Sequence, residues 1–190
     1  IVILGSGGAG KSTLARQLGA LLGLPVVHLD TLFWRAGWVE TPRDERLPLL
    51  EQVVRSDAWI LDGSWAGTGL SLRLAAADTI LFLDLPRTLC LYRVVSRWLA
   101  FRGRTRPDLP EDCPERLDPE FARWIWEFPY RHRPRLLRAI AAHQDGRRVV
   151  RLRSTSAASA FLDAVRAEIS SLLPPLLAGE IPTDSIDTAT

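Results

Sequence analysis

Five short apolar runs, separated by longer amphipathic stretches, dominate the hydrophobic pattern of the chain. The runs cover residues 1–4, 25–29, 59–61, 79–83 and 148–152. Runs of this length that are rich in Val, Ile and Leu favour buried β-strands. The stretches between them repeat their apolar residues at the spacing of a helix. Strands that alternate with helices predict an α/β fold with a parallel sheet of about five strands.

Two helix starts are indicated by their cap residues. In the segment 41–44 (TPRD), Thr41 is the predicted N-cap, with a proline in the first turn and an acid three residues on. Asp118 precedes a proline in the same way and is the predicted cap of a second helix, which we expect to end near Glu127.

A polar segment at residues 102–117, rich in Pro, Asp and Arg, is too long for a simple connection. Long loops of this kind often cover an active site, so we predict a lid here. Residues 1–173 are predicted to form one domain that includes this lid. Residues 174–190 are rich in Pro, Thr, Ser and Asp and are expected to be a disordered tail.

The composition is that of one globular domain, with 190 residues of which 47% are hydrophobic. No stretch has the length of a membrane span, and no signal peptide precedes the first run. Cys90 and Cys113 show neither metal-ligand spacing nor a paired framework, which predicts a reducing, cytoplasmic location. The chain begins at Ile1 without methionine, so we expect natural residues to precede it.

The segment 5–12 (GSGGAGKS) is a full match to the phosphate-binding P-loop, G-x-x-x-x-G-K-S/T. It lies between a predicted strand and a predicted helix, which is the setting that this motif requires. Its Lys11 is the only lysine of the chain, beside 23 arginines. A glycine-rich turn without a ligand is the alternative. The predicted nucleotide-binding residues are Gly5, Ser6, Gly7, Gly8, Ala9, Gly10, Lys11, Ser12 and Thr13.

The residue types of this motif match the chemistry of ATP bound with Mg²⁺. Glycines let successive backbone N–H groups converge on phosphate oxygens, and a helix N-terminus favours the anion. Lys11 would reach the β- and γ-phosphates, and the hydroxyl of Ser12 would bind Mg²⁺. A GTPase is disfavoured, because the guanine motif Asn-Lys-x-Asp would need a second lysine.

Acids end three of the predicted strands, where parallel sheets bind their ligands. Asp30 could orient or deprotonate a substrate hydroxyl, or it could cap the next helix. Asp62 follows an apolar strand and precedes a glycine, as in a Walker-B strand whose aspartate holds Mg²⁺ through water; a turn is the alternative. Asp84 precedes Leu85-Pro86 and is predicted to be a helix cap.

Arg93 and Arg97 share one face of the predicted helix that leads into the lid. Such a pair can stabilise charge on a transferring phosphoryl group, and a solvated face is the alternative. Residues 87–153 hold 16 arginines against 8 acids, whereas the remainder holds 8 basic and 14 acidic residues. A block of this kind can bind nucleic acid or clamp phosphate, or it can reflect solvated helix faces.

Several of the seven tryptophans lie in predicted connections rather than in strands. Trp34, Trp38 and Trp65 could stack on a flat substrate, or they could simply pack the domain. Trp124 and Trp126 cannot share one helix face, so one of them is expected to be exposed. His28 lies in a strand and is interpreted as core or hydrogen-bonded scaffold.

Together these segments resemble the P-loop family of DNA topology modulation proteins, over about residues 1–155. The segments that carry the resemblance are 5–12, 28–34 (HLDTLFW), 37–38 (GW), 59–65 (WILDGSW), 78–93, 106–108, 113–116 and 120–129 (EFARWIWEFP). The resemblance implies a P-loop nucleotide-kinase-like fold, and the family name implies a role with DNA.

That family is similar in turn to adenylate kinases. This similarity implies that Asp62 holds the water shell of Mg²⁺ and that Arg93 and Arg97 lie at the base of the lid. The chain departs from adenylate kinases after Gly63, where it has Ser-Trp in place of Phe-Pro-Arg. A nucleoside monophosphate acceptor is therefore not implied, and Arg73 is the candidate to replace the missing arginine.

The preferred hypothesis is an ATP·Mg²⁺-dependent phosphotransferase of the nucleotide- or small-molecule-kinase type, because phosphoryl transfer needs mainly positioning and charge stabilisation. Its expected partners are a nucleotide and a small-molecule acceptor. The alternative is an ATP-binding regulator associated with DNA. DNA is possible as a partner of the chain but is disfavoured. The predicted catalytic residues are Lys11, Asp30, Asp62, Arg93 and Arg97, and the predicted metal ligands are Ser12 and, through water, Asp62.

Overall fold

The computed structural model describes residues 1–65, 67, 69–106 and 108–172. A five-stranded parallel sheet with strand order β2-β5-β1-β6-β7 lies at its centre. Its strands are β1 (Val2–Gly5), β2 (Val26–His28), β5 (Ile60–Asp62), β6 (Thr79–Leu83) and β7 (Arg148–Leu152). Each strand coincides with a predicted apolar run to within two residues at either end. The predicted α/β fold is therefore confirmed.

Helices and one small hairpin surround this sheet. The helices are α1 (Lys11–Leu22), α2 (Leu29–Phe33), α3 (Arg43–Val54), α4 (Leu70–Ala76), α5 (Arg87–Ala100), α6 (Pro119–Arg131), α7 (Arg133–Ala141) and α8 (Thr155–Leu172). The hairpin consists of β3 (Trp34–Arg35), the 3-10 turn η1 (Ala36–Trp38) and β4 (Val39–Glu40). It follows α2 directly and leads into α3.

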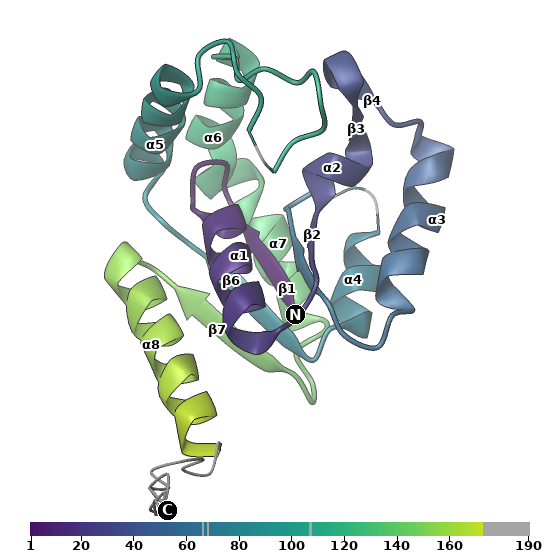
Figure 1. Ribbon diagram of the computed structural model, residues 1–190, viewed down its shortest axis with the longest axis vertical. Helices are drawn as coiled ribbons and strands as arrows, with labels where there is room; N and C mark the ends of the chain where they lie inside the picture. Colours follow the sequence, from purple (N-terminus) through teal and green to yellow (C-terminus); the bar gives the residue numbers. More distant parts are fainter. Residues whose placement is uncertain (66, 68, 107, 173–190) are drawn as a thin grey trace, which may run out of the picture.

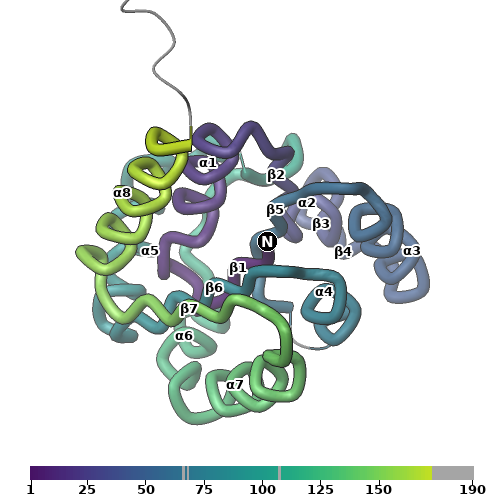
Figure 2. Tube along the Cα trace, turned by 90° about the horizontal axis from the view of Figure 1, so that it is seen from below, coloured from purple at the N-terminus to yellow at the C-terminus, as the bar shows by residue number. Residues whose placement is uncertain are grey.

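The sheet separates two hydrophobic cores because successive residues of a strand point to opposite faces. Val2 and Leu4 of β1 pack in the core with α3, α4 and α7, whereas Ile3 packs in the core with α1, α5 and α8. Figure 2 shows α1 and α8 together on one side of the sheet and α4 and α7 on the other. The architecture is thus the three-layer P-loop arrangement.

The structure confirms one predicted helix start and corrects the other. Asp118 caps α6, since its carboxylate accepts hydrogen bonds from the backbone N–H groups of Glu120 and Phe121. The N-cap of α3 is Pro42 rather than Thr41. The Thr41 hydroxyl instead donates to the carbonyl of Leu32, 2.9 Å away, and ties the hairpin to α2.

The predicted end of α6 near Glu127 is wrong, because the helix continues to Arg131 through Pro129. A proline inside a helix removes one backbone hydrogen bond. Ile125 and Phe128 precede Pro129 and are buried, one in each of the two cores. The helical bonding resumes after Pro129, since the backbone N–H of His132 donates to the carbonyl of Phe128, 3.1 Å away, and α7 follows α6 after this single residue.

The described parts of the segment 102–117, residues 102–106 and 108–117, are here called the lid. They cross from α5 and α6 toward the β3–β4 hairpin above the carboxyl ends of the strands (Figure 1). Leu109 and Cys113 are buried in it, and so are the acids Asp108 and Glu115. The composition predicted a segment with few apolar anchors. The lid is packed more firmly than this because Asp108 and Glu115 are paired with arginines, as described below.

None of the helices in the described ranges combines the length and the apolar character needed to cross a membrane. The tail predicted at residues 174–190 lies outside the described residues.

Candidate active site

The P-loop connects the end of β1 to the start of α1. Gly8 has a φ of +74°, and a Cβ there would lie 2.2 Å from the carbonyl oxygen of Cys90 in α5, so only glycine fits. Gly10 is the N-cap of α1, and no side chain within the described residues caps this helix. The first N–H groups of α1 are therefore available to bind an anion, as a phosphate-binding loop requires.

Lys11 is the first residue of α1, and its ammonium donates to the carbonyl oxygen of Ser6, 3.0 Å away across the loop. Burial lowers the pKa of Lys11, whereas the carboxylates of Asp62 and Asp30 act in the opposite direction. A desolvated cation gains strongly from a further negative charge nearby. The position of Lys11 therefore suits a polyphosphate lying in the loop.

Ser12 and Asp62 line the same cavity as the loop. Asp62 ends β5, and only 3% of its surface is exposed. Hydroxyl and carboxylate oxygens are donors that Mg²⁺ prefers, and it commonly takes one or two from the protein and the rest from water and phosphate. Across the described ranges, no three His, Cys, Asp or Glu side chains cluster as a direct metal site. The donors fit Mg²⁺ held with water and phosphate.

His28 is hydrogen-bonded, as one of its two predicted roles requires, but the sequence did not indicate that its partner is Asp62, the predicted metal ligand. Its Nδ1 lies 2.6 Å from Oδ1 of Asp62. Burial lowers the pKa of His28, but the hydrogen bond and charge of Asp62 outweigh it, and the pKa is raised. The contact exists because β2 and β5 are neighbours in the sheet and their register places these two residues opposite each other.

One side of the cavity, next to α2 and the β3–β4 hairpin, is lined by Asp30 and an aromatic cluster. Oδ1 of Asp30 accepts a hydrogen bond from Nε1 of Trp65, 3.1 Å away. The ring of Trp34 lies 6.0 Å from that of Trp65 and 5.4 Å from that of Trp38, centre to centre. These three indoles and Asp30 all line the cavity. A carboxylate beside aromatic faces can bind a hydroxyl-bearing molecule with a flat side.

Arg46 supports this aromatic side from outside the cavity. Its guanidinium lies 5.0 Å from the centre of the Trp65 ring and 5.5 Å from that of Phe33. Its Nε donates to the carbonyl of Thr41, 2.7 Å away. The buried Arg46 thus contacts the rings from behind and does not line the cavity.

The arginine pair predicted on α5 lies on the cavity, but its two members have different contacts. Arg93 donates to the carbonyl of Ala9 in the P-loop (3.2 Å) and to the hydroxyl of Thr155 at the start of α8 (2.7 Å). Arg97 donates to Glu115 of the lid, 2.9 Å away. Arg93 therefore joins the P-loop to α8, whereas Arg97 joins α5 to the lid.

Ion pairs hold the lid above the P-loop. Glu115 lies between Arg97 and Arg106, and Arg106 also donates to Asp108, 2.7 Å away. Burial lowers the pKa of Arg97, and Arg106 lowers it further, whereas Glu115 raises it. Phosphate oxygens could replace these carboxylates as partners of the two guanidinium groups, because both ligands accept the same fork of hydrogen bonds.

The lid also contacts the hairpin that carries the aromatic side of the cavity. The backbone N–H of Gly37 donates to the carbonyl of Asp112 (3.0 Å), and Nε1 of Trp38 donates to the carbonyl of Pro114 (3.1 Å). Trp38 and Asp112 both have positive φ, 62° and 55°, which costs on the order of 1 kcal/mol or more each in non-glycine residues. This contact closes the cavity on the side of the hairpin.

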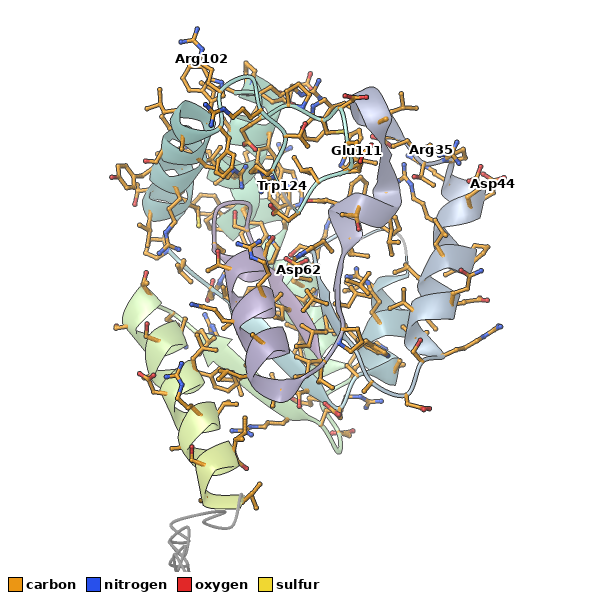
Figure 3. The ribbon with its side chains drawn as sticks, viewed as in Figure 1. Arg35, Asp44, Asp62, Arg102, Glu111 and Trp124 are labelled. Carbon is orange, nitrogen blue, oxygen red and sulfur yellow. The ribbon has the colours of Figure 1, made fainter. Side chains whose placement is uncertain are left out.

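The cavity bounded in this way has a volume of about 860 Å³, large enough for a nucleotide and a small second molecule. In the view of Figure 3, Trp124 of α6 lies above Asp62, and both residues line the cavity. The predicted site residues that the structure brings together along this cavity are Gly7, Gly8, Gly10, Lys11, Ser12, Thr13, Asp30, Asp62, Arg93 and Arg97. Gly5, Ser6 and Ala9 complete the loop behind them.

Two interpretations of single residues are wrong. Asp84 is not a helix cap; its carboxylate accepts hydrogen bonds from Arg133 and Arg151, and although burial raises its pKa, these bonds keep the pKa below its ordinary value. Arg73 does not face a substrate. It is fully buried and donates to the carbonyls of Gly63 and Trp65 (both 2.8 Å), and burial lowers its pKa to about 10.

Further residues on the cavity had no predicted role. Phe121 of α6 lies on the P-loop, since a Cβ at Gly7 would be 2.4 Å from its ring. Asp108, Glu115 and Arg106 are paired inside the lid. These residues lie in segments 106–108 and 113–116, which are among those that carry the family resemblance. The resemblance therefore pointed to these segments, but it did not predict which residues they contact. Trp124 faces the cavity and Trp126 is 48% exposed, which confirms that one member of this pair is exposed.

Comparison with known proteins identifies the fold and not the family. No protein-family model matches the sequence. No curated protein matches it either. The resemblance to DNA topology modulation proteins therefore stays a prediction.

Among solved structures, 124 chains match the structure. A shikimate kinase from Acinetobacter baumannii in complex with shikimate is 16% identical, with a TM-score of 0.54, over 90% of this chain and 93% of that one. A shikimate kinase from Bacteroides thetaiotaomicron is 15% identical, with a TM-score of 0.48, over 89% of this chain and 96% of that one. The chain therefore has the fold of P-loop kinases.

Proposed function

We propose that this protein is an ATP·Mg²⁺-dependent phosphotransferase that transfers the γ-phosphoryl group to a hydroxyl group of a small molecule. The observation that carries this proposal is that one cavity joins the P-loop to Asp30 and the three indoles. A protein that binds a nucleotide but no acceptor would need only the P-loop part of this cavity. The fold of the solved kinases supports the same reaction class.

Bound Mg·ATP would supply the phosphoryl group and neutralise part of its charge. The chain contributes position and further charge stabilisation, which are what phosphoryl transfer asks of a protein. Lys11 would exchange the carbonyl of Ser6 for phosphate oxygens, and Ser12 and Asp62 would hold the metal. Arg97 would turn from Glu115 toward the transferring group.

Asp30 would act on the acceptor. One of its oxygens accepts from Trp65, which fixes the carboxylate plane and leaves the other oxygen for a substrate hydroxyl. The indoles of Trp34 and Trp38 would lie against the rest of the acceptor. A carboxylate in this position can orient the hydroxyl and accept its proton.

A screen for ATP consumption tests this function. Purified protein with ATP and Mg²⁺ would be assayed against sugars, nucleosides, nucleotides and small hydroxy acids, including shikimate, which the Acinetobacter baumannii structure contains. We expect at least one class to give a phosphorylated product visible by ³¹P NMR. ATP binding with no product from any class would contradict the proposal.

The lid should be protected when nucleotide binds. Trypsin is expected to cut after the exposed Arg102 and Arg104, while Arg106 precedes a proline and resists cleavage. Phosphates that pair with Arg106, the arginine of the lid that lines the cavity, would favour the closed lid, so saturating ATP·Mg²⁺ should slow this cleavage about tenfold or more. Cleavage after Arg55 at the end of α3, far along the chain from the lid, is the internal control. An unchanged rate at the lid would contradict closure.

DNA binding should be weak, because acids pair with much of the arginine block. Arg133 and Arg151 bind Asp84, Arg97 and Arg106 bind Glu115, and Arg123 and Arg131 bind Glu127. A protein that neutralises several DNA phosphates loses about a thousandfold or more in affinity between low and moderate salt. We expect little duplex binding at physiological salt, with or without ATP. Tight, nucleotide-dependent binding in a fluorescence titration would favour the DNA-associated regulator instead.

A further inference from the structure

The His28–Asp62 pair is the feature that the proposed reaction leaves without a role. His28 ends β2, Asp62 ends β5, and the parallel register places them opposite each other at the carboxyl edge of the sheet. Their side chains meet at 2.6 Å, from Nδ1 to Oδ1. This contact lies where the P-loop and Ser12 also line the cavity.

The backbone on both sides of this contact is fixed. Gly63 follows Asp62 with a φ of +134°, and a Cβ on it would lie 2.6 Å from Cβ of Leu29, the residue after His28. The two strand ends therefore pass each other without room for a side chain. Leu29 is also fully buried, so the two strand ends are packed closely against each other beside the His28–Asp62 contact.

The side chain of Asp62 still needs a partner that sets its rotation. A carboxylate torsion is broad and roughly two-fold, so a fixed backbone does not by itself orient the two oxygens. Within the described ranges, the only hydrogen-bond partner of this carboxylate is His28. The imidazole is bonded to Oδ1, so Oδ2 is the oxygen that remains for a further ligand.

We propose that His28 is a positioning residue that orients the Asp62 carboxylate toward the Mg²⁺ of bound Mg·ATP. The inference rests on the proposed function, since it concerns the same metal. His28 acts through Asp62 and touches neither nucleotide nor metal. Groups that hold a metal ligand in this way commonly contribute ten- to a hundredfold to metal affinity or activity.

The experiment compares His28→Ala with His28→Asn at one fixed pH. Alanine removes the hydrogen bond, whereas the side-chain amide nitrogen of asparagine lies close to the position of Nδ1 and can donate to Oδ1. His143→Ala is the matched control, because His143 bonds a backbone carbonyl of its own helix end, that of Ala139. Binding of a fluorescent ATP analogue is measured in EDTA and across a Mg²⁺ titration, together with the melting temperature.

We expect His28→Ala to raise the Mg²⁺ concentration at half-maximal binding about tenfold or more, with affinity in EDTA changed less than about twofold. His28→Asn should restore most of the loss, and His143→Ala should behave as wild type. When Asp62 is already replaced by asparagine, His28→Ala should raise the Mg²⁺ concentration at half-maximal binding only a little further, because His28 acts on the metal through the carboxylate of Asp62.

Other results would overturn the inference. The first is an unchanged Mg²⁺ concentration at half-maximal binding in His28→Ala. The second is a loss of Mg²⁺ affinity that His28→Asn does not restore. The third is a loss in the double variant equal to the sum of the losses in His28→Ala and Asp62→Asn. Wild-type protein that binds Mg·ATP but transfers no phosphoryl group would refute the proposed function while this test still decides the role of His28. Wild-type protein that does not bind Mg·ATP would refute both.

Discussion

Lys11→Ala is expected to lower phosphoryl transfer about a hundred- to a thousandfold, the usual effect of removing one group that stabilises transition-state charge. The ammonium is the only lysine charge in the chain and lies in the P-loop, 3.0 Å from the carbonyl of Ser6. Steady-state turnover and ATP-analogue binding measure the loss. Because burial already disfavours this charge, the free energy of unfolding should change by no more than about 1 kcal/mol.

Arg55→Ala is the control for loss of a single cation. Its side chain is 77% exposed at the end of α3, and it should bind and turn over ATP as wild type does. Normal turnover in Lys11→Ala would contradict the assignment of the P-loop as the phosphate site. A large fall in the melting temperature of Lys11→Ala would show that the lysine serves the fold instead.

Asp30→Asn and Asp62→Asn are expected to separate acceptor chemistry from metal binding. Asp30→Asn should lower acceptor phosphorylation on the order of a hundred- to ten-thousandfold, the range for a lost general base, while background ATP hydrolysis stays close to wild type. The amide oxygen of the substituted side chain can still accept from Nε1 of Trp65, so the aromatic side should keep its structure. Product formation and phosphate release are measured in parallel.

Asp62→Asn should lower both activities and raise the Mg²⁺ requirement, because the amide keeps the shape but loses the charge that holds the metal's water shell. Nucleotide affinity in EDTA should change little. Equal effects of the two substitutions on both activities would contradict this division of roles. The comparison is well matched, since both acids line one cavity and both changes remove one negative charge.

Most of the sheet could be predicted because its three central strands, β1, β5 and β6, are buried on both faces. Such strands are apolar along their whole length, so runs such as 1–4 and 79–83 stand out from the amphipathic helices around them. The end of α6 could not be predicted in this way. Pro129 is a local signal to stop, but a proline removes only its own N–H group. The helix continues to Arg131, and the N–H of His132 still donates to the carbonyl of Phe128, 3.1 Å away.

The predicted residues of the site lie together for a related reason. The P-loop is a local motif that needs only its own strand and helix, and acids that end parallel strands meet at one edge of the sheet. Asp84 shows the limit of that rule, because its strand end also faces α7 and β7, where Arg133 and Arg151 bind it. Burial of Arg73 against the loop after β5 was equally invisible in its local sequence.

The sequence by itself determined the phosphate loop, the alternation of strands and helices, and the acids at the cavity, because each follows from neighbouring residues along the chain. Only the tertiary structure decided which side chains pair with one another around the cavity. His28 meets Asp62 through strand register, Glu115 meets Arg97 through the path of the lid, and Trp65 meets Asp30 across two strand ends. These contacts join residues 18 to 35 positions apart, and the cores on both faces of the sheet fix them.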